Sequence, residues 1–191
     1  MDPVTALQSG RAVLLPTDTV YGLCALAADE NAVRAMYELK GRASRQPTAL
    51  LAAGVEQLLA AVPELDEHLL RALLPGAYTL VLANPARRFA WLAGERPDTI
   101  GVRVPVLDDA VAAVLEATGP VAATSANEPG EPPAAALEDV APRIRAACGA
   151  ELDGGRLPGT ASTVIDFTGD DPVVIREGAA PSADAIARVS R

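Results

Sequence analysis

The stretch STVIDFTGDDPVVIR, residues 162–176, decides the fold class of this chain. Two runs rich in β-branched residues, 163–167 and 173–176, flank the polar turn Thr168-Gly169-Asp170-Asp171. Such runs on either side of a glycine-containing turn are typical of an antiparallel hairpin. This part of the sequence therefore predicts two strands that pair directly, without a helix between them.

The rest of the sequence mixes short apolar runs with segments of helical spacing. The apolar runs predict strands at 12–15, 21–26, 48–52, 78–83, 101–104 and 121–123. The helical spacing predicts helices from Asp29 to Gly41, at 55–60, 64–74, 107–115, 137–147 with a kink at Pro142, and 182–190. Because strand pairs and helices do not alternate strictly, we expect an α/β or α+β domain with a twisted mixed sheet. A length of 191 residues suits one domain over 1–191.

The composition limits the classes of partner. Half of the residues are hydrophobic, which is enough for a sizeable core, whereas aromatic residues make up only 3%. Single-stranded RNA is held largely by stacking on aromatic side chains, so this composition argues against such a module. The net charge of −9 argues against a general nucleic-acid surface, because phosphates require many cations. A local basic cleft remains compatible with it.

The cysteines and the apolar segments bear on location. Cys24 and Cys148 have no metal-ligand spacing, and they predict reduced thiols, although a disulfide stays open. No N-terminal stretch has a basic region followed by an apolar run, and no segment is long enough to cross a bilayer. We therefore expect a cytoplasmic protein without membrane contact.

Lys40 is the only lysine among 16 basic residues, and it is followed by Gly41, Arg42 and, three residues later, Arg45. Lysine offers a compact point charge and arginine a flat fork, and a polyphosphate site can use both. Helix C-termini also favour cations because of the helix dipole, which is an ordinary structural explanation. Both interpretations stay open from these residues alone.

Three other clusters place polar side chains at the ends of apolar runs. The first is the loop PTDTVYGL, 16–23, and the second is TSAN, 124–127, where Ser125 and Asn127 would project the same way if the segment stays extended. The third combines Ser162 with Arg176. Ordinary polar turns and edge-strand arginines could equally explain them. Loops at strand ends are nevertheless where binding groups gather.

The residue types indicate the class of chemistry. No nucleophile–base pair of the protease type is present, and His68, the only histidine, belongs to a helix that we expect to be exposed and non-catalytic. No Cys/His or dense carboxylate set indicates a metal site built into the protein. Lys40, Arg42, Arg103 and Arg176 instead predict positioning and charge neutralisation around a polyphosphate, without covalent catalysis.

Seven motifs follow one another along almost the whole chain, and with them the sequence resembles the YrdC-like family of L-threonylcarbamoyladenylate synthases, in its single-domain form. The motifs are PTDTVYGL (16–23), KGR (40–42), LPGAYTL (74–80), GVRVP (101–105), TSAN (124–127), STVID (162–166) and REG (176–178). The resemblance implies a twisted mixed sheet with flanking helices and a concave electropositive cleft. It also implies that L-threonine, bicarbonate and ATP give threonylcarbamoyl-AMP, pyrophosphate and water. This is the first step of N6-threonylcarbamoyladenosine formation next to the tRNA anticodon.

The resemblance also implies roles for particular residues. The family's signature tetrad, expected to be catalytic, corresponds to Lys40, Arg42, Ser125 and Asn127. Threonine would be bound by Thr19, Arg103, Ser125 and Ser162, and ATP by Lys40, Arg42, Thr99, Asn127 and Arg176. Mg²⁺ would arrive with the nucleotide. We expect Lys40 and Arg42 to be exposed in the cleft, so that alanine at either position lowers turnover and leaves the fold intact.

Two alternatives remain beside the synthase. One is a non-catalytic relative that binds RNA or a nucleotide through the same cleft. The other is a carbamoyl-transfer module like those of hydrogenase maturation factors, against which the length of the chain argues. For the synthase, we expect downstream tRNA threonylcarbamoyl-transfer proteins as partners, and weak direct binding of tRNA as a further interaction.

Overall fold

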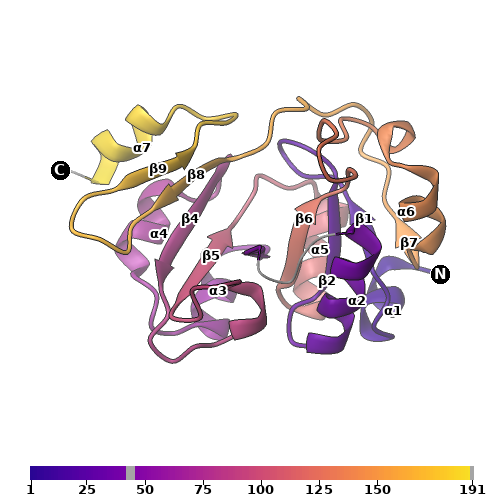
Figure 1. The fold of residues 1–191 in the computed structure, drawn as a ribbon, viewed down its shortest axis with the longest axis horizontal. Coiled ribbons are helices and arrows are strands. Elements are labelled where there is room, and N and C mark those ends of the chain that lie inside the picture. Colours follow the sequence, from indigo (N-terminus) through magenta and orange to yellow (C-terminus); the bar gives the residue numbers. More distant parts are fainter. Residues whose placement is uncertain (42–45, 190–191) are drawn as a thin grey trace.

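The computed structural model describes residues 1–41 and 46–189, and in them nine strands form one sheet (Figure 1). The order across the sheet is β7-β1-β2-β6-β3-β5-β4-β8-β9. The strands are β1 (Val13–Leu15), β2 (Gly22–Leu26), β3 (Ala49–Leu51), β4 (Tyr78–Ala83), β5 (Thr99–Arg103), β6 (Val121–Ser125), β7 (Ala150–Glu151), β8 (Thr163–Asp166) and β9 (Val173–Arg176). The helices are α1 (Pro3–Gln8), α2 (Glu30–Lys40), α3 (Val55–Ala61), α4 (Glu67–Leu73), α5 (Asp109–Thr118), α6 (Pro142–Ala147) and α7 (Ser182–Val189), with 3-10 turns at Ala90–Leu92 and Leu137–Asp139.

The sheet is mixed, as expected. β1 pairs with β7, β3 with β5, and β4 with β8 in parallel, and the other neighbours pair antiparallel. The predicted hairpin of β8 and β9 is confirmed. Its register moves from Val164 opposite Arg176 to Ile165 opposite Val174, which leaves Ile175 as an extra residue. This bulge lies beside Arg176, one of the predicted site residues.

The two faces of the sheet are covered to different extents. On one face, Leu23, Leu50 and neighbouring strand residues join the main core with residues of α2, α3, α4, α6 and α7. The adjacent residues Cys24 and Leu51 project to the other face, because side chains alternate along a strand, and join a smaller core with α1 and α5. In Figure 1, α1 lies near the β1 end of the sheet, far from β8 and β9. Much of the second face over β3, β5, β4 and β8 is therefore available for a cavity.

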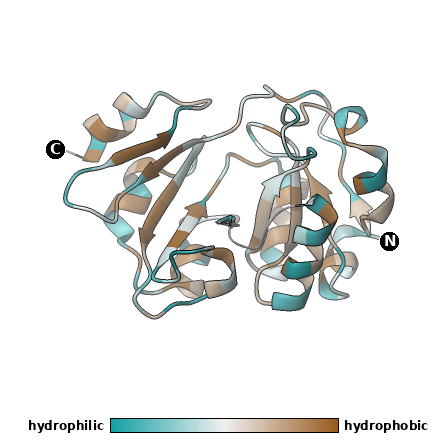
Figure 2. Ribbon diagram, viewed as in Figure 1, coloured by the Kyte–Doolittle hydropathy of each residue, from teal (hydrophilic) through white to brown (hydrophobic). Residues whose placement is uncertain are grey.

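Hydropathy follows this architecture. Figure 2 shows strongly hydrophobic colours along β4, β5, β8 and β9, whereas hydrophilic colours gather on the helices. β9 is exposed along its whole length, and Val173 and Ile175 are the most exposed of its apolar residues. β9 is one of the two edge strands of the sheet, and β7 is the other.

The structure corrects the predicted elements at three places. α1 was not predicted, although Asp2 caps it by accepting from Thr5 N and Pro3 begins it. The two-residue strand β7 was also not predicted. The single helix expected at 137–147 is wrong. It divides into a 3-10 turn and α6, because Pro142 has no N–H to continue a helix and holds Ala141 outside it.

Candidate active site

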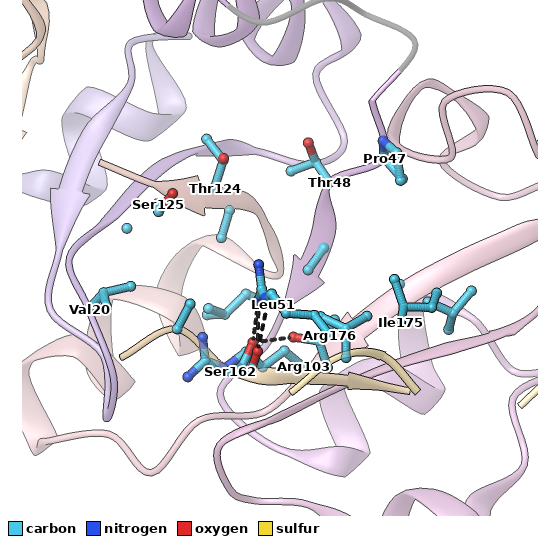
Figure 3. A pocket seen from close by; sticks show the side chains of 18 of the residues that line it. Val20, Pro47, Thr48, Leu51, Arg103, Thr124, Ser125, Ser162, Ile175 and Arg176 are labelled. Atoms are coloured by element: carbon cyan, nitrogen blue, oxygen red, sulfur yellow. Dashed lines mark hydrogen bonds between the residues drawn. The ribbon is translucent and has the colours of Figure 1, made fainter. Parts of the chain in front are cut away.

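A cavity of about 760 Å³ lies on the open face of the sheet (Figure 3). Its floor comes from alternate residues of four strands: Thr79 and Val81 of β4, Gly101 and Arg103 of β5, Ala49 and Leu51 of β3, and Ala123 and Ser125 of β6. Its walls come from loops, including Thr17, Pro47, Thr48, Arg96, Pro133 and Ser162. The volume lies in the range of small-molecule sites.

Small side chains explain why the cavity exists. Ala49, Gly101 and Ala123 face it from three adjacent strands, where larger residues would fill the space. Polar groups stand around this apolar floor. The cavity can therefore hold a ligand against the sheet, and the polar groups at the strand ends can bind it.

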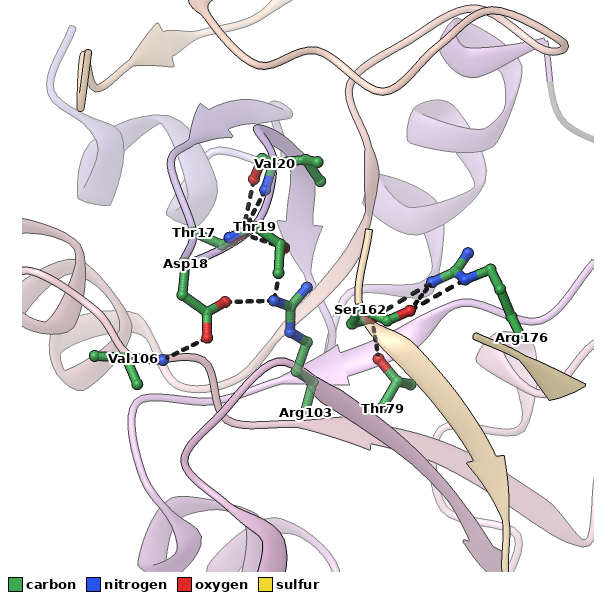
Figure 4. Close-up of polar contacts among 9 residues, drawn as sticks. All are labelled: Thr17, Asp18, Thr19, Val20, Thr79, Arg103, Val106, Ser162 and Arg176. Carbon is green, nitrogen blue, oxygen red and sulfur yellow. Dashed lines mark hydrogen bonds and ion pairs between the residues drawn. The ribbon is translucent and has the colours of Figure 1, made fainter. Parts of the chain in front are cut away.

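Arg103 is the most enclosed charge in the cavity, with an exposed fraction of 7% (Figure 4). Its Nη2 donates to Thr19 Oγ1 at 2.7 Å and to Asp18 Oδ1. Thr19 is held in turn by Thr17, whose Oγ1 lies 3.0 Å from Thr19 Oγ1 and donates to Val20 O at 2.7 Å. The predicted polar loop thus wraps around the end of β5 and fixes the guanidinium.

Among the residues that the structure describes, two buried polar atoms of the cavity lining lack a hydrogen-bond partner, Arg103 Nε and Thr48 Oγ1. Burial lowers the pKa of Arg103 below its ordinary value, and Asp18 opposes this change. Buried polar atoms are normally paired, since each unpaired one costs about 1–3 kcal/mol. Arg103 lines the cavity, so its enclosed positive charge favours an anionic group there.

Ser162 and Arg176 form a second polar cluster on the adjacent wall (Figure 4). Arg176 Nη2 and Nε donate to Ser162 O at 2.8 and 3.1 Å, and Ser162 Oγ lies 2.8 Å from Thr79 Oγ1. Burial lowers the pKa of Arg176 below its ordinary value. The predicted proximity of Ser162 and Arg176 is confirmed.

Gly178 explains how Ser162 is placed. A Cβ at Gly178 would stand 2.5 Å from the carbonyl carbon and 2.6 Å from the carbonyl oxygen of Ser162. Real side chains do not tolerate such contacts, so glycine lets the two backbones approach. Gly178 N also donates to Thr163 Oγ1 at 2.9 Å. The REG motif therefore holds the loop before β8 against the end of β9.

Three other predicted residues lie in or next to the cavity. Thr99 lines it, and its hydroxyl donates to Arg96 O at 2.9 Å. Ser125 lines it at the end of β6, opposite Gly22 of β2. Thr19 is fully buried and reaches the site through its hydrogen bond to Arg103.

Lys40 and Asn127 lie differently from the expectation. Lys40 is only 5% exposed, so the prediction that it stands exposed in the cleft is wrong. Its Nζ donates to Ser125 O at 2.7 Å, to Asn127 Oδ1 at 2.8 Å and to Asn127 O. The chain bends after β6, and the Asn127 amide donates to Glu128 O and Glu131 O, facing a separate cavity of about 430 Å³. The expectation that Ser125 and Asn127 face one ligand is therefore not met in this structure.

Two predicted cations, Arg42 and Arg45, lie outside the described residues. His68 lies exposed on α4, as expected, and does not line the cavity. From the sequence we did not single out Asp18, Thr48, Thr79 or Arg96, although Asp18 and Thr79 stood inside quoted motifs.

The described residues were expected to form neither a metal site nor a membrane-spanning helix. Within 1–41 and 46–189, no group of three or more His, Cys, Asp or Glu side chains is arranged to hold a metal ion. In the same part of the chain, no helix has the length and apolar character needed to cross a membrane. Cys24 and Cys148 are free thiols, in agreement with the expectation.

Comparison with known proteins gives the context. The family model Sua5_yciO_yrdC, described as "Telomere recombination", matches residues 5–178. A putative threonylcarbamoyl-AMP synthase of Mycobacterium leprae is 36% identical over 179 residues, which cover 92% of this chain and 80% of that protein. The threonylcarbamoyl-AMP synthase of Pyrococcus abyssi is 37% identical over 179 residues, but this chain spans only 52% of it.

Two solved structures share the fold. The crystal structure of Pyrococcus abyssi Sua5 complexed with L-threonine has a TM-score of 0.84 and 34% identity, covering 97% of this chain and 56% of that one. The crystal structure of Escherichia coli YciO has a TM-score of 0.82 and 28% identity, covering 95% and 89%. The family model and these relatives extend over nearly all of the sequence, and the chain belongs to the Sua5/YciO/YrdC family.

Proposed function

We propose that this chain is a threonylcarbamoyl-AMP synthase, a nucleotidyltransferase that uses L-threonine, bicarbonate and ATP and releases pyrophosphate. The observation that carries the proposal is the pair Arg103 and Arg176 in the lining of one cavity, with Ser162 hydrogen-bonded to Arg176. Two cations around a small apolar floor suit a ligand pair with two anionic groups. The structural relative complexed with L-threonine supports the same substrate here.

Arg103 is the proposed partner of the threonine carboxylate. Arg103 lines the cavity, and guanidinium groups bind carboxylates as charged forks. Ser125 and Ser162 line the same cavity and offer hydroxyls to the rest of the amino acid, and Thr19 supports Arg103. In this arrangement the threonine amine faces the cavity interior, where bicarbonate joins it.

The nucleotide is proposed to lie beside Arg176, on β9, and Thr99, which begins the strand β5 that Arg103 ends. Arg42 completes the proposed set. Lys40 and Asn127 are proposed to act on the loop after β6, which Lys40 holds in place. Mg²⁺ is part of the MgATP substrate, because it favours phosphate oxygens and needs few protein ligands.

The reaction requires two bond-forming steps. The deprotonated amine of threonine attacks the carbon of bicarbonate, and loss of water leaves an N-carboxylate. One oxygen of this carbamate then attacks the α-phosphorus of ATP, and pyrophosphate leaves. Phosphoryl and nucleotidyl transfers of this kind depend chiefly on alignment and charge stabilisation, which the two arginines supply. The product would serve tRNA threonylcarbamoyl transfer by other proteins of the cytoplasm.

Pyrophosphate release with MgATP in bicarbonate buffer, with and without L-threonine, tests the proposal. Release should require threonine, and Arg103→Lys should raise the KM for threonine by about tenfold or more, since lysine cannot reproduce a bidentate fork. Arg34→Lys is the matched control, because Arg34 is exposed and pairs only with Glu30 on α2. Wild-type protein that releases no pyrophosphate under these conditions contradicts the proposal.

A second candidate function rests on the similarity to the uncharacterized protein YciO of Escherichia coli, which is 31% identical over 92% of this chain. This candidate is a module that binds RNA or a nucleotide without turnover. It predicts tRNA binding that weakens steeply with salt, because phosphate contacts release counterions. Salt-sensitive tRNA binding by a protein that lacks pyrophosphate release would favour it over the synthase.

A further inference from the structure

Asp18 does not line the cavity, although its ion-pair partner Arg103 does. Its Oδ1 accepts from Arg103 Nη2, and its Oδ2 accepts from the backbone N–H of Val106 at 3.1 Å (Figure 4). The side chains of Arg103 and Asp18 are 8% and 15% exposed. One carboxylate therefore ties the 16–21 loop to the end of β5 and to the loop that follows it.

The ion pair offsets part of the cost of burying the Arg103 guanidinium. A buried guanidinium without a counter-charge is costly, and burial alone lowers the pKa of Arg103. Asp18 offsets this cost from outside the cavity lining. Both recorded donations of Arg103 leave from Nη2, while Nε is left without a partner. The charge is thus kept in place at the edge of the cavity that Arg103 lines.

From this geometry we infer that Asp18 is a positioning residue, which holds the Arg103 guanidinium for the carboxylate of an α-amino acid. The inference rests on the proposed function, in which that amino acid is threonine. Asp18 acts through Arg103 and does not contact the substrate. Its role differs from simple charge balance, because a negative charge near the site would by itself weaken binding of an anion.

Asp18→Asn separates these two roles. Arg103 and the Val106 N–H bind different oxygens of Asp18, and an amide in the same orientation keeps an acceptor oxygen at only one of these two positions. If Asp18 positions Arg103, the KM for L-threonine should rise by about tenfold, a coupling typical of residues in one network. The KM for ATP should stay within about twofold. If Asp18 only balances charge, the KM for threonine should fall.

The measurements are steady-state pyrophosphate release and the free energy of unfolding in urea, for wild type, Asp18→Asn, Arg103→Lys and the double variant. Because Asp18 acts through Arg103, the double variant should bind threonine within about threefold of Arg103→Lys. Additive losses in the double variant overturn the positioning role. A loss of folded protein alone would lower the maximal rate without raising the KM for threonine, and that result also overturns it.

A second pair of variants avoids any change of charge. Val106→Pro removes the N–H that holds Asp18 Oδ2, whereas Val106→Ala keeps it, and Val106 is 61% exposed. The proline variant should raise the KM for threonine by about threefold or more, and the alanine variant should match wild type. Equal KM values for threonine in the proline and alanine variants overturn the inference. Threonine-dependent pyrophosphate release by wild type would in that case still support the proposed function. Wild type without that release overturns both.

Discussion

Replacing Lys40 by methionine tests whether this lysine supports the site from within the protein. Methionine keeps an unbranched apolar side chain and removes all three donations from Nζ, to Ser125 O, Asn127 O and Asn127 Oδ1. These bonds join the end of α2 to the chain that leaves β6. We therefore expect the variant to lose stability as well as turnover, in contrast to the expectation from sequence.

The magnitude follows from the contacts. A hydrogen bond to a charged group contributes about 1.5–3 kcal/mol, so three such bonds give a gross sum of about 4.5–9 kcal/mol. Desolvation of the ammonium group, with an exposed fraction of 5% for Lys40, offsets several kcal/mol of this sum. A net loss of about 3 kcal/mol remains, which lowers the Tm of a chain of this size by about 6–12 °C.

Urea unfolding followed by circular dichroism measures the loss. Arg34→Met is the control, because its ion pair with Glu30 has side chains 61% and 42% exposed and should change the free energy of unfolding by less than about 0.5 kcal/mol. Lys40→Arg keeps the charge, but a planar fork cannot aim at the same three oxygens, so it should also be destabilised. A Lys40→Met variant as stable as the control would refute the structural role.

Three other variants or conditions test separate features. Ser162→Ala removes the partner of Thr79 Oγ1 and should cost about 1–3 kcal/mol of stability while raising the KM for threonine, as measured by urea unfolding and pyrophosphate release. Gly178→Ala should cost about 1–3 kcal/mol because its Cβ meets the Ser162 backbone, whereas Gly169→Ala, with its nearest contact at 3.8 Å, should cost less than about 1 kcal/mol. Burial raises the pKa of Cys24 to about 12 and that of Cys148 to about 11, from an ordinary 9.0. The unfolded chain then loses these protons first, so stability should fall as pH rises from about 9 to 12, and unchanged stability over that range in urea titrations would contradict the assignment.

Local signals identified most of the elements. The hairpin was predictable because its turn residues and β-branched runs adjoin in the sequence. α2 was predictable because Asp29 caps it and Gly41, with φ of 67°, ends it. The order of strands was not, since β6 lies between β2 and β3, and nothing local records which strand becomes its neighbour.

The site was predictable in its residue types more than in its geometry. Arg103, Ser162 and Arg176 meet in one cavity as the motifs suggested. The burial of Lys40 could not be predicted, because its partners lie 85 and 87 residues away. The role of Asp18 was hidden for the same reason, since its partner Arg103 is 85 residues distant.

The cavity wall is drawn from nearly the whole chain, from Thr17 to Arg176. Parallel pairs such as β4 with β8 join segments far apart in sequence, and such pairings close slowly because loop entropy is lost before contacts form. During refolding, the cavity should be completed only when the last of these strands has docked. Recovery of ligand binding thus reports completion of the entire sheet, later than the formation of any single helix.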